Sequence, residues 1–183
     1  MKLSKEYIEE LELLHSKKSF GTQHSIPKEV NNILQKNKVG SFLDYGCGKG
    51  LLSESVKNQY PDINLYSYDP VTSPIDIPNS VEFTYSSDVL EHVEPNFIDE
   101  TLDKLFAITT KYQYHLIACH PAKKFLSDGR NAHLIIENPK WWKRKIENYG
   151  WKILHEDINE YNAQPKKGPS IHVVKYIVLL EKQ

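Results

Sequence analysis

Cysteine and long apolar runs are scarce in this 183-residue sequence. The two cysteines, Cys47 and Cys119, fall in segments expected to be buried. We interpret them as packing residues, so no disulfide, cysteine metal site or redox chemistry is expected. The longest apolar run, residues 176–180, is far too short to cross a bilayer. Residues 1–6 lack the apolar core of a signal peptide, which predicts a cytoplasmic protein with no membrane partner.

Charge of either sign is not in excess. The chain has 23 Lys and Arg residues against 24 Asp and Glu residues, a net charge of −1 at pH 7. This balance argues against a surface tuned to the phosphate backbone of a nucleic acid. A content of 39% hydrophobic and 26% charged residues is that of one ordinary globular domain over residues 1–183. The short basic clusters are interpreted as solvated faces: residues 17–18, 123–124, 143–145 and 166–167.

Strand-like segments alternate with amphipathic helical segments along most of the chain. Such alternation predicts an α/β fold, with a mostly parallel sheet and helices on both of its faces. The expected helices cover residues 50–59, 98–106 and a segment that begins at Asn138 and stops at Gly150. The expected strands cover residues 41–45, 63–68, 81–87 and 112–119, followed by a closing pair at 151–154 and 171–180.

A glycine-rich turn follows the first of these strands. Residues 42–50 read Phe-Leu-Asp-Tyr-Gly-Cys-Gly-Lys-Gly, which differs from the G-x-G-x-x-G spacing of dinucleotide-binding turns. Asp44, two residues before the first glycine, would repel a phosphate but can pair with an ammonium group. Asp69 ends the next strand, where folds of this kind place the carboxylate that binds ribose hydroxyls. The combination indicates S-adenosylmethionine as the ligand; the alternative for the glycines alone is an ordinary tight turn.

Three motifs together resemble those of the class I S-adenosylmethionine-dependent methyltransferases. The glycine turn is similar to their motif I, Asp69 matches their ribose-binding acid, and residues 87–93 are similar to their Asp-Val-Leu-Glu-His-Val run. The resemblance spans residues 38–182 and implies a Rossmann-like sheet with an antiparallel last strand. The implied cofactor-binding residues are Asp44, Tyr45, Gly46, Cys47, Gly48, Gly50, Asp69, Pro70, Ser87 and Asp88.

One segment departs from that family pattern. Only about a dozen residues separate Asp69 from the strand at 81, and three of them are prolines, so the usual third strand and its helix do not fit. We therefore predict six strands, with the strand at 63–68 at one edge. The wall around the adenine must then come from the proline-rich loop or from the N-terminal segment.

That N-terminal segment, residues 1–37, is expected to be helical. Helices are predicted over residues 4–16 and 27–36. In the family that the chain resembles, such helices commonly lie over the cofactor site. The link at residues 20–24 is then either a lid or an ordinary connector.

The candidate catalytic residues are histidines near the ends of strands. Methyl transfer needs positioning and, for an acidic nucleophile, one base. His92, His120 and His133 are the candidates for that base. Trp141, Trp142 and Tyr149 are candidates for stacking on a substrate ring, although aromatic residues on a helix are more often part of the core.

The same region raises the question of a metal. An acid-x-x-Glu-His run joined by a later histidine resembles the divalent-metal site of the small-RNA 3′-end 2′-O-methyltransferases and of the ubiquinone-pathway O-methyltransferases. The resemblance implies Asp88, Glu91, His92 and His133 as ligands, with Glu91, His92 and His133 as the main candidates. Asp88 stands where that family has glutamate. Many other methyltransferases use the run only to shape the pocket floor, so structural histidines remain the favoured interpretation.

The overall prediction is an S-adenosylmethionine-dependent methyltransferase that acts on a small molecule at oxygen or nitrogen. One alternative is an RNA or other nucleic-acid methyltransferase, but the Asn/Asp-Pro-Pro-aromatic signature of amino-methyltransferases is absent at residues 86–89. The other alternative is a non-catalytic module that only binds the cofactor. The acceptor is not specified, because its pocket depends on the loops at residues 17–26, 120–137 and 159–169.

Overall fold

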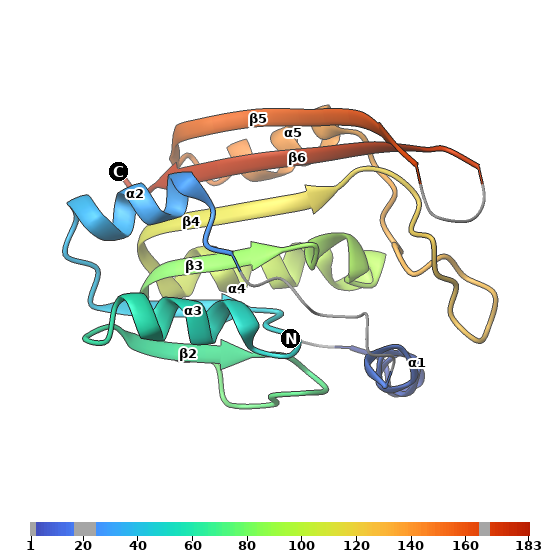
Figure 1. The fold of residues 1–183 in the computed structure, drawn as a ribbon, viewed down its shortest axis with the longest axis horizontal. Coiled ribbons are helices and arrows are strands. Elements are labelled where there is room, and N and C mark those ends of the chain that lie inside the picture. The colour runs from blue at the N-terminus through green and yellow to red at the C-terminus, as the bar shows by residue number, and fades with distance from the viewer. Residues whose placement is uncertain (1–2, 17–24, 165–168) are drawn as a thin grey trace.

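The sheet at the centre of the fold has six strands in the order β2-β1-β3-β4-β6-β5 (Figure 1). The computed structural model of the protein describes residues 3–16, 25–164 and 169–183. The four strands β1 to β4 run parallel, whereas β6 is antiparallel to both β4 and β5. The strand bounds are Ser41–Tyr45 for β1, Asn64–Tyr68 for β2, Val81–Ser87 for β3, Thr109–Ala118 for β4, Lys152–Ala163 for β5 and Ile171–Glu181 for β6.

Helices cover both faces of this sheet (Figure 1). The apolar sides of α2 and α3 bury Val30, Leu34, Leu52 and Val56 against one face, and α4 and α5 pack against the other. No helix in the described ranges is long and apolar enough to cross a membrane. The helices are α1 (Lys5–His15), α2 (Lys28–Lys36), α3 (Leu51–Gln59), α4 (Ile98–Ile108) and α5 (Pro139–Glu147), with short 3-10 helices η1 (Leu90–His92) and η2 (Pro95–Phe97).

The predicted loss of the third strand is confirmed. β2 lies at the edge of the sheet, and no strand forms between residues 70 and 80, all of which are described. The chain instead turns back at once, because Asp69 and Ser73 exchange backbone hydrogen bonds of 3.0 and 3.2 Å. Prolines in the rest of this loop cannot donate to a further ladder, which leaves β2 as the edge.

Two strands differ from their predicted extents. β4 starts at Thr109 rather than at residue 112, and β5 runs to Ala163 although the sequence predicted a strand only to 154 and a loop from 159. The cause in β5 is its position, because an edge strand paired only with β6 has little buried face and therefore lacks the apolar alternation. The link at residues 20–24, predicted as a lid or connector, lies outside the described residues.

The helix α1 lies beyond the carboxyl ends of the parallel strands (Figure 1). Its Tyr7, Leu11 and Leu14 are buried against Leu126 and Ala132, which belong to the long segment between β4 and α5. Ser4 caps the helix, since its hydroxyl accepts from the Tyr7 N–H at 3.2 Å. This placement brings residues from opposite parts of the chain to the end of the sheet where α/β proteins bind ligands.

Candidate active site

A cleft of about 330 Å³ lies at the carboxyl ends of β1, β2 and β3. One side, which we call the glycine-turn side, is formed by residues 44–48, from the end of β1 into the turn that follows, and by Asp69 and Pro70 after β2. The other side, which we call the histidine side, is formed by residues 87–89, His92 and Val93. Leu3 and residues of α1 also line the cleft. A cleft of this size suits a small ligand or a cofactor.

The glycine turn holds its shape through backbone contacts. Both Gly46 N and Cys47 N donate to the Tyr68 carbonyl oxygen, at 2.7 and 2.9 Å. Gly46 has a φ of +79°, and a Cβ placed on it would lie 2.4 Å from a methyl carbon of Val89. A side chain at this position would therefore be strained and would also collide with its neighbour.

The Asp69 carboxylate joins the two loops of the glycine-turn side. One of its oxygens accepts from Gly48 N at 3.2 Å, and the other accepts from Val71 N and Thr72 N, each at 3.0 Å. His15 Nε2 lies 3.8 Å from the same carboxylate. A carboxylate offers about four lone-pair positions, so these amides leave room for about one further donor unless a bond is exchanged.

Asp44 is a buried acid at the base of the turn. Its side-chain oxygen accepts from Ser53 Oγ at 2.6 Å, and Ser67 Oγ donates to Ser53 Oγ at 2.7 Å. Burial raises the pKa of Asp44 to about 6, although the Ser53 hydrogen bond acts in the opposite direction. A positive ligand group would stabilise its charged form.

Asp88 lies on the histidine side of the cleft, where its carboxylate pairs with a lysine. Both of its carboxylate oxygens accept from Lys175 Nζ on β6, at 2.9 and 2.8 Å. Its backbone has a φ of +53°, which is uncommon for a residue other than glycine. Asp88 lines the cleft, but its carboxylate is engaged by a lysine and does not join the other three residues of the implied metal set.

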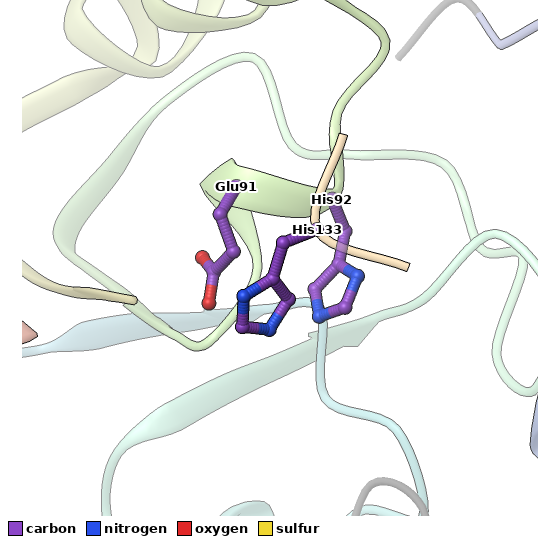
Figure 2. A group of neighbouring side chains, drawn as sticks. All are labelled: Glu91, His92 and His133. Carbon is purple, nitrogen blue, oxygen red and sulfur yellow. The ribbon is translucent and has the colours of Figure 1, made fainter. Parts of the chain in front are cut away.

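Glu91, His92 and His133 form a compact group (Figure 2). Each residue offers one potential ligand atom, and these atoms lie within 4.8 Å of one another. Glu91 and His92 come from η1, and His133 comes from the segment between β4 and α5. The rings of His92 and His133 meet edge to face, with centroids 4.9 Å apart. The structure thus brings together side chains from the two segments that the sequence analysis singled out.

Backbone carbonyls fix the orientation of both rings. His92 Nδ1 lies 2.7 Å from the Ala132 carbonyl oxygen, and His133 Nδ1 lies 2.5 Å from the His120 carbonyl oxygen. A carbonyl oxygen can only accept, so each Nδ1 carries the hydrogen. In the neutral rings Nε2 is therefore the nitrogen with the lone pair.

Glu91 is fully buried within this group. Its Oε1 accepts from Ala118 N at 3.2 Å, whereas its Oε2 is buried with no hydrogen-bond partner among the described residues. Burial and the nearby Asp88 charge raise the Glu91 pKa well above its usual range. Burial also lowers the pKa of His92, to about 4, and that of His133.

His120 is the third candidate base, and it lies behind the other two. Its Nδ1 is 2.9 Å from the Val174 carbonyl oxygen, and its ring centroid is 5.5 Å from that of His133. Of the three candidate bases, only His92 lines the cleft. His120 therefore contributes its carbonyl, which orients His133.

Several other candidates lie away from the cleft. Gly50 is the N-cap residue of α3 and does not line the cleft. Trp142 is fully buried in the core, and Tyr149 stacks on Phe106 at a centroid distance of 3.9 Å, so the core interpretation applies to them.

The expectation of buried cysteines was wrong. Cys47 and Cys119 are both half-buried, because Cys47 lies in the turn at the cleft and Cys119 follows the end of β4.

Several residues of the cleft were not predicted from the sequence. Tyr7 and His15 of α1 line it, as do Tyr68 and Tyr85 at the ends of β2 and β3. The strand positions carried a signal, since side chains at the carboxyl ends of parallel strands gather at one edge. The resemblance implied that the N-terminal helices lie over the cofactor site, but it did not single out Tyr7 or His15.

Comparison with known proteins identifies the family and the fold of the chain. A family model described as a methyltransferase domain matches residues 21–164. No curated protein sequence matches the chain. Two solved structures each have a TM-score of 0.61. One is the 1,6-didemethyltoxoflavin-N1-methyltransferase of Burkholderia thailandensis, at 12% identity over 100% of this chain and 91% of the other. The other is an S-adenosylmethionine-dependent methyltransferase of Methanosarcina mazei, at 11% identity over 86% and 98%.

A third structure, TehB of Haemophilus influenzae, has a TM-score of 0.55 at 14% identity. The match covers 91% of this chain but only 65% of TehB. At such identities the structures establish a shared fold, and the family model covers most of the chain. The protein belongs to the class I methyltransferases. Its fold is the one found in solved methyltransferases that use S-adenosylmethionine.

Proposed function

We propose that this methyltransferase transfers the methyl group of S-adenosylmethionine to an oxygen or nitrogen atom of a small molecule. The observation that carries the proposal is a single cleft that joins a glycine turn and two strand-end acids to a histidine. The Burkholderia neighbour, which shares the fold over nearly its full length, is named as an N1-methyltransferase of 1,6-didemethyltoxoflavin and has S-adenosylhomocysteine bound. The balanced charge of the chain agrees with a small acceptor.

The cofactor is assigned to the glycine-turn side. Asp44 pairs with the ammonium group of the methionine moiety, because a buried carboxylate gains most from a nearby positive charge. The backbone of residues 45–48 approaches the cofactor closely, and Asp69 accepts from a ribose hydroxyl after exchanging one of its amide bonds. Pro70 and α1 form the wall around the adenine in place of the missing strand.

The acceptor is assigned to the histidine side, where Ser87 and Asp88 lie between the two ligands. Methyl transfer is an in-line displacement, so the acceptor atom must face the sulfonium from the side opposite the leaving sulfur. His92 lines the cleft and carries its lone pair on Nε2, which allows it to take a proton from an acceptor hydroxyl or amine. In this assignment the Ala132 carbonyl orients His92, and the His120 carbonyl orients His133 beside it.

Calorimetric titration with S-adenosylhomocysteine tests the cofactor assignment. Gly48→Val should weaken binding by blocking the backbone approach, and Asp69→Ala should weaken it by removing hydrogen bonds that contribute about 1 to 3 kcal/mol. Asp69→Asn is the matched control, because it keeps one acceptor oxygen. Unchanged affinity in Gly48→Val and Asp69→Ala would contradict the assignment, and preferential binding of a nicotinamide dinucleotide would indicate an oxidoreductase instead.

Transfer itself is tested with S-adenosylmethionine carrying a labelled methyl group. Incubation with a metabolite extract should produce S-adenosylhomocysteine and a labelled small molecule, and Asp69→Ala should reduce both products. Label found only in added RNA would favour the nucleic-acid alternative. Cofactor binding without any transfer would favour the non-catalytic module.

A further inference from the structure

The group of Glu91, His92 and His133 contains more than a base needs. A general base requires one lone pair directed at the acceptor, whereas here a carboxylate and a second imidazole lie beside the first (Figure 2). Glu91 Oε2 is buried and has no hydrogen-bond partner in the described part of the chain. Leaving a carboxylate oxygen in this state costs free energy, so a bound positive species at that oxygen would relieve an unfavourable arrangement.

The backbone contacts of the two rings have a second consequence. Ala132 and His120 hold Nδ1 of the two rings through their carbonyls, so in the neutral rings the lone pair is on Nε2. Imidazoles that bind metals in proteins have their other nitrogen held in this way by a carbonyl or a carboxylate. The two rings of this group therefore already have the second-layer contacts of metal ligands.

We propose that Glu91, His92 and His133 form a binding site for one divalent transition-metal ion. Ligand atoms about 2.1 Å from an ion are separated from one another by about 3.0 to 3.4 Å. Because the atoms here lie within 4.8 Å of one another, each pair needs to close by at most about 2 Å on binding. One carboxylate with two imidazoles selects manganese, iron, cobalt or zinc rather than calcium or magnesium.

The position of the site gives the ion a role, which rests on the proposed methyl transfer and in which the ion replaces His92 as the group that assists loss of the acceptor proton. Of its three ligands, His92 lines the cleft, so the open coordination positions face the acceptor. An acceptor hydroxyl bound there loses its proton to solvent more readily, because the ion stabilises the resulting oxyanion. That oxygen then bonds to the methyl carbon as the carbon–sulfur bond breaks, which leaves S-adenosylhomocysteine as a neutral thioether. The acceptor class is thus a molecule with one or two metal-binding oxygens.

Metal binding is measured first, without reference to activity. The chelator-treated, dialysed protein is titrated with Co²⁺ and, separately, with Zn²⁺, by calorimetry and by the visible absorption of ligated Co²⁺. We expect one ion per chain and a higher melting temperature with the metal. Glu91→Gln and His133→Ala should each lower the affinity for the metal strongly. The loss should exceed that caused by removing a residue that only holds a metal ligand, which is about 10- to 100-fold.

The matched control is His172→Ala, because His172 is an exposed histidine of β6 outside the group. It should bind Co²⁺ as the parent protein does. Circular dichroism of every variant verifies folding, and Glu91→Gln keeps an oxygen that can accept from Ala118 N. A parent protein without stoichiometric binding, or equal loss in His172→Ala and His133→Ala, would overturn the site.

The outcomes separate this site from the proposed function. If Co²⁺ binds as expected but S-adenosylhomocysteine does not, the metal site stands and the cofactor assignment fails. If both bind and methyl transfer continues at full rate after chelation, the catalytic role of the ion is overturned and His92 acts as the base. Loss of transfer on chelation, with cofactor affinity unchanged and transfer restored by added metal, supports the full proposal.

Discussion

The two sides of the cleft are built in different ways. The glycine-turn side is formed by the backbone, with glycines at positive φ and amides that donate to Tyr68 and Asp69. The histidine side is formed by side chains that come from η1 and from the segment between β4 and α5. The first side lies within two consecutive strand–loop units, whereas the second joins residues about forty positions apart in the sequence.

This difference determines how each side tolerates change. A turn defined by backbone conformation fails when any side chain is added at its tightest point, whatever the chemistry of that side chain. A site defined by side chains keeps its shape when one member is replaced by a residue of similar size and loses only the chemistry of that member. The two sides should therefore respond independently to substitution unless they are coupled by α1, whose His15 lies near Asp69 and whose Tyr7 donates to the His92 carbonyl.

The largest effect is expected at Gly46. An alanine Cβ there would lie 2.4 and 2.7 Å from the two methyl carbons of Val89, at a φ of +79°. Overpacking and the left-handed conformation together should lower the free energy of unfolding by about 2 to 5 kcal/mol. Affinity for S-adenosylhomocysteine should fall by more than about tenfold, since a distortion of this size exceeds 1.4 kcal/mol. Urea unfolding and calorimetry measure the two quantities.

The double variant Gly46→Ala/Val89→Ala separates the two causes. Removing the Val89 methyl groups relieves the collision but not the backbone strain, so part of the stability should return. A Gly46→Ala protein as stable as the parent would show that the turn is not defined by its backbone, and the contrast between the two sides would then be lost.

The glycine-turn side could be predicted from the sequence because its determinants are local. The order of strand, acid, glycines and helix start is contained in nine residues, and Asp69 follows one strand later. The absence of the third strand was equally local, since the eleven residues at 70–80 cannot hold a strand and a helix. The number of residues in a segment can be counted in the sequence, so a segment too short for a strand and a helix can be recognised without a structure.

The histidine side and α1 could be predicted only in part. The proximity of His133 to Glu91 depends on the path of residues 119–138, which have no periodic pattern. The pairing of Asp88 with Lys175 depends on β6 lying beside β4, a contact across most of the chain. The cytoplasmic location and the limits of the domain stay predictions from the sequence.

A smaller effect is expected for Asp44→Asn. This variant should be more stable than the parent protein above about pH 6 but should bind S-adenosylhomocysteine more weakly. Burial raises the pKa of Asp44 to about 6, so the folded state binds its proton more tightly than the unfolded chain does. This stabilising contribution is complete below about pH 4 and is lost as the pH rises to about 6. Above that pH the buried charge lowers the free energy of unfolding by up to about 3 kcal/mol, and Asp44→Asn should remove this penalty.

Binding should change in the other direction. In the parent protein the affinity for S-adenosylhomocysteine should rise with pH through about 6, as the carboxylate that pairs with the ligand ammonium forms. Asp44→Asn should bind more weakly, with no such rise. Melting temperatures and calorimetry at pH 5 and pH 8 give both quantities. A variant that is less stable than the parent at pH 8 would contradict a destabilising buried charge at this position.

The smallest effect is expected for Tyr7→Phe, which tests whether α1 couples the two sides. The Tyr7 hydroxyl donates to the His92 carbonyl oxygen at 2.6 Å, and the ring is 1% exposed. Losing this bond while keeping the ring should lower the free energy of unfolding by about 1 kcal/mol. Tyr66→Phe is the control, because the Tyr66 hydroxyl accepts an exposed bond from Asn64 and its loss should cost less.

The same variant tests binding at both sides. If the sides are independent, Tyr7→Phe changes Co²⁺ affinity at the histidine side. The affinity for S-adenosylhomocysteine then stays within about twofold, a difference of about 0.4 kcal/mol. A loss of S-adenosylhomocysteine binding as large as that in Gly46→Ala would instead make α1 a shared wall through which each side depends on the other.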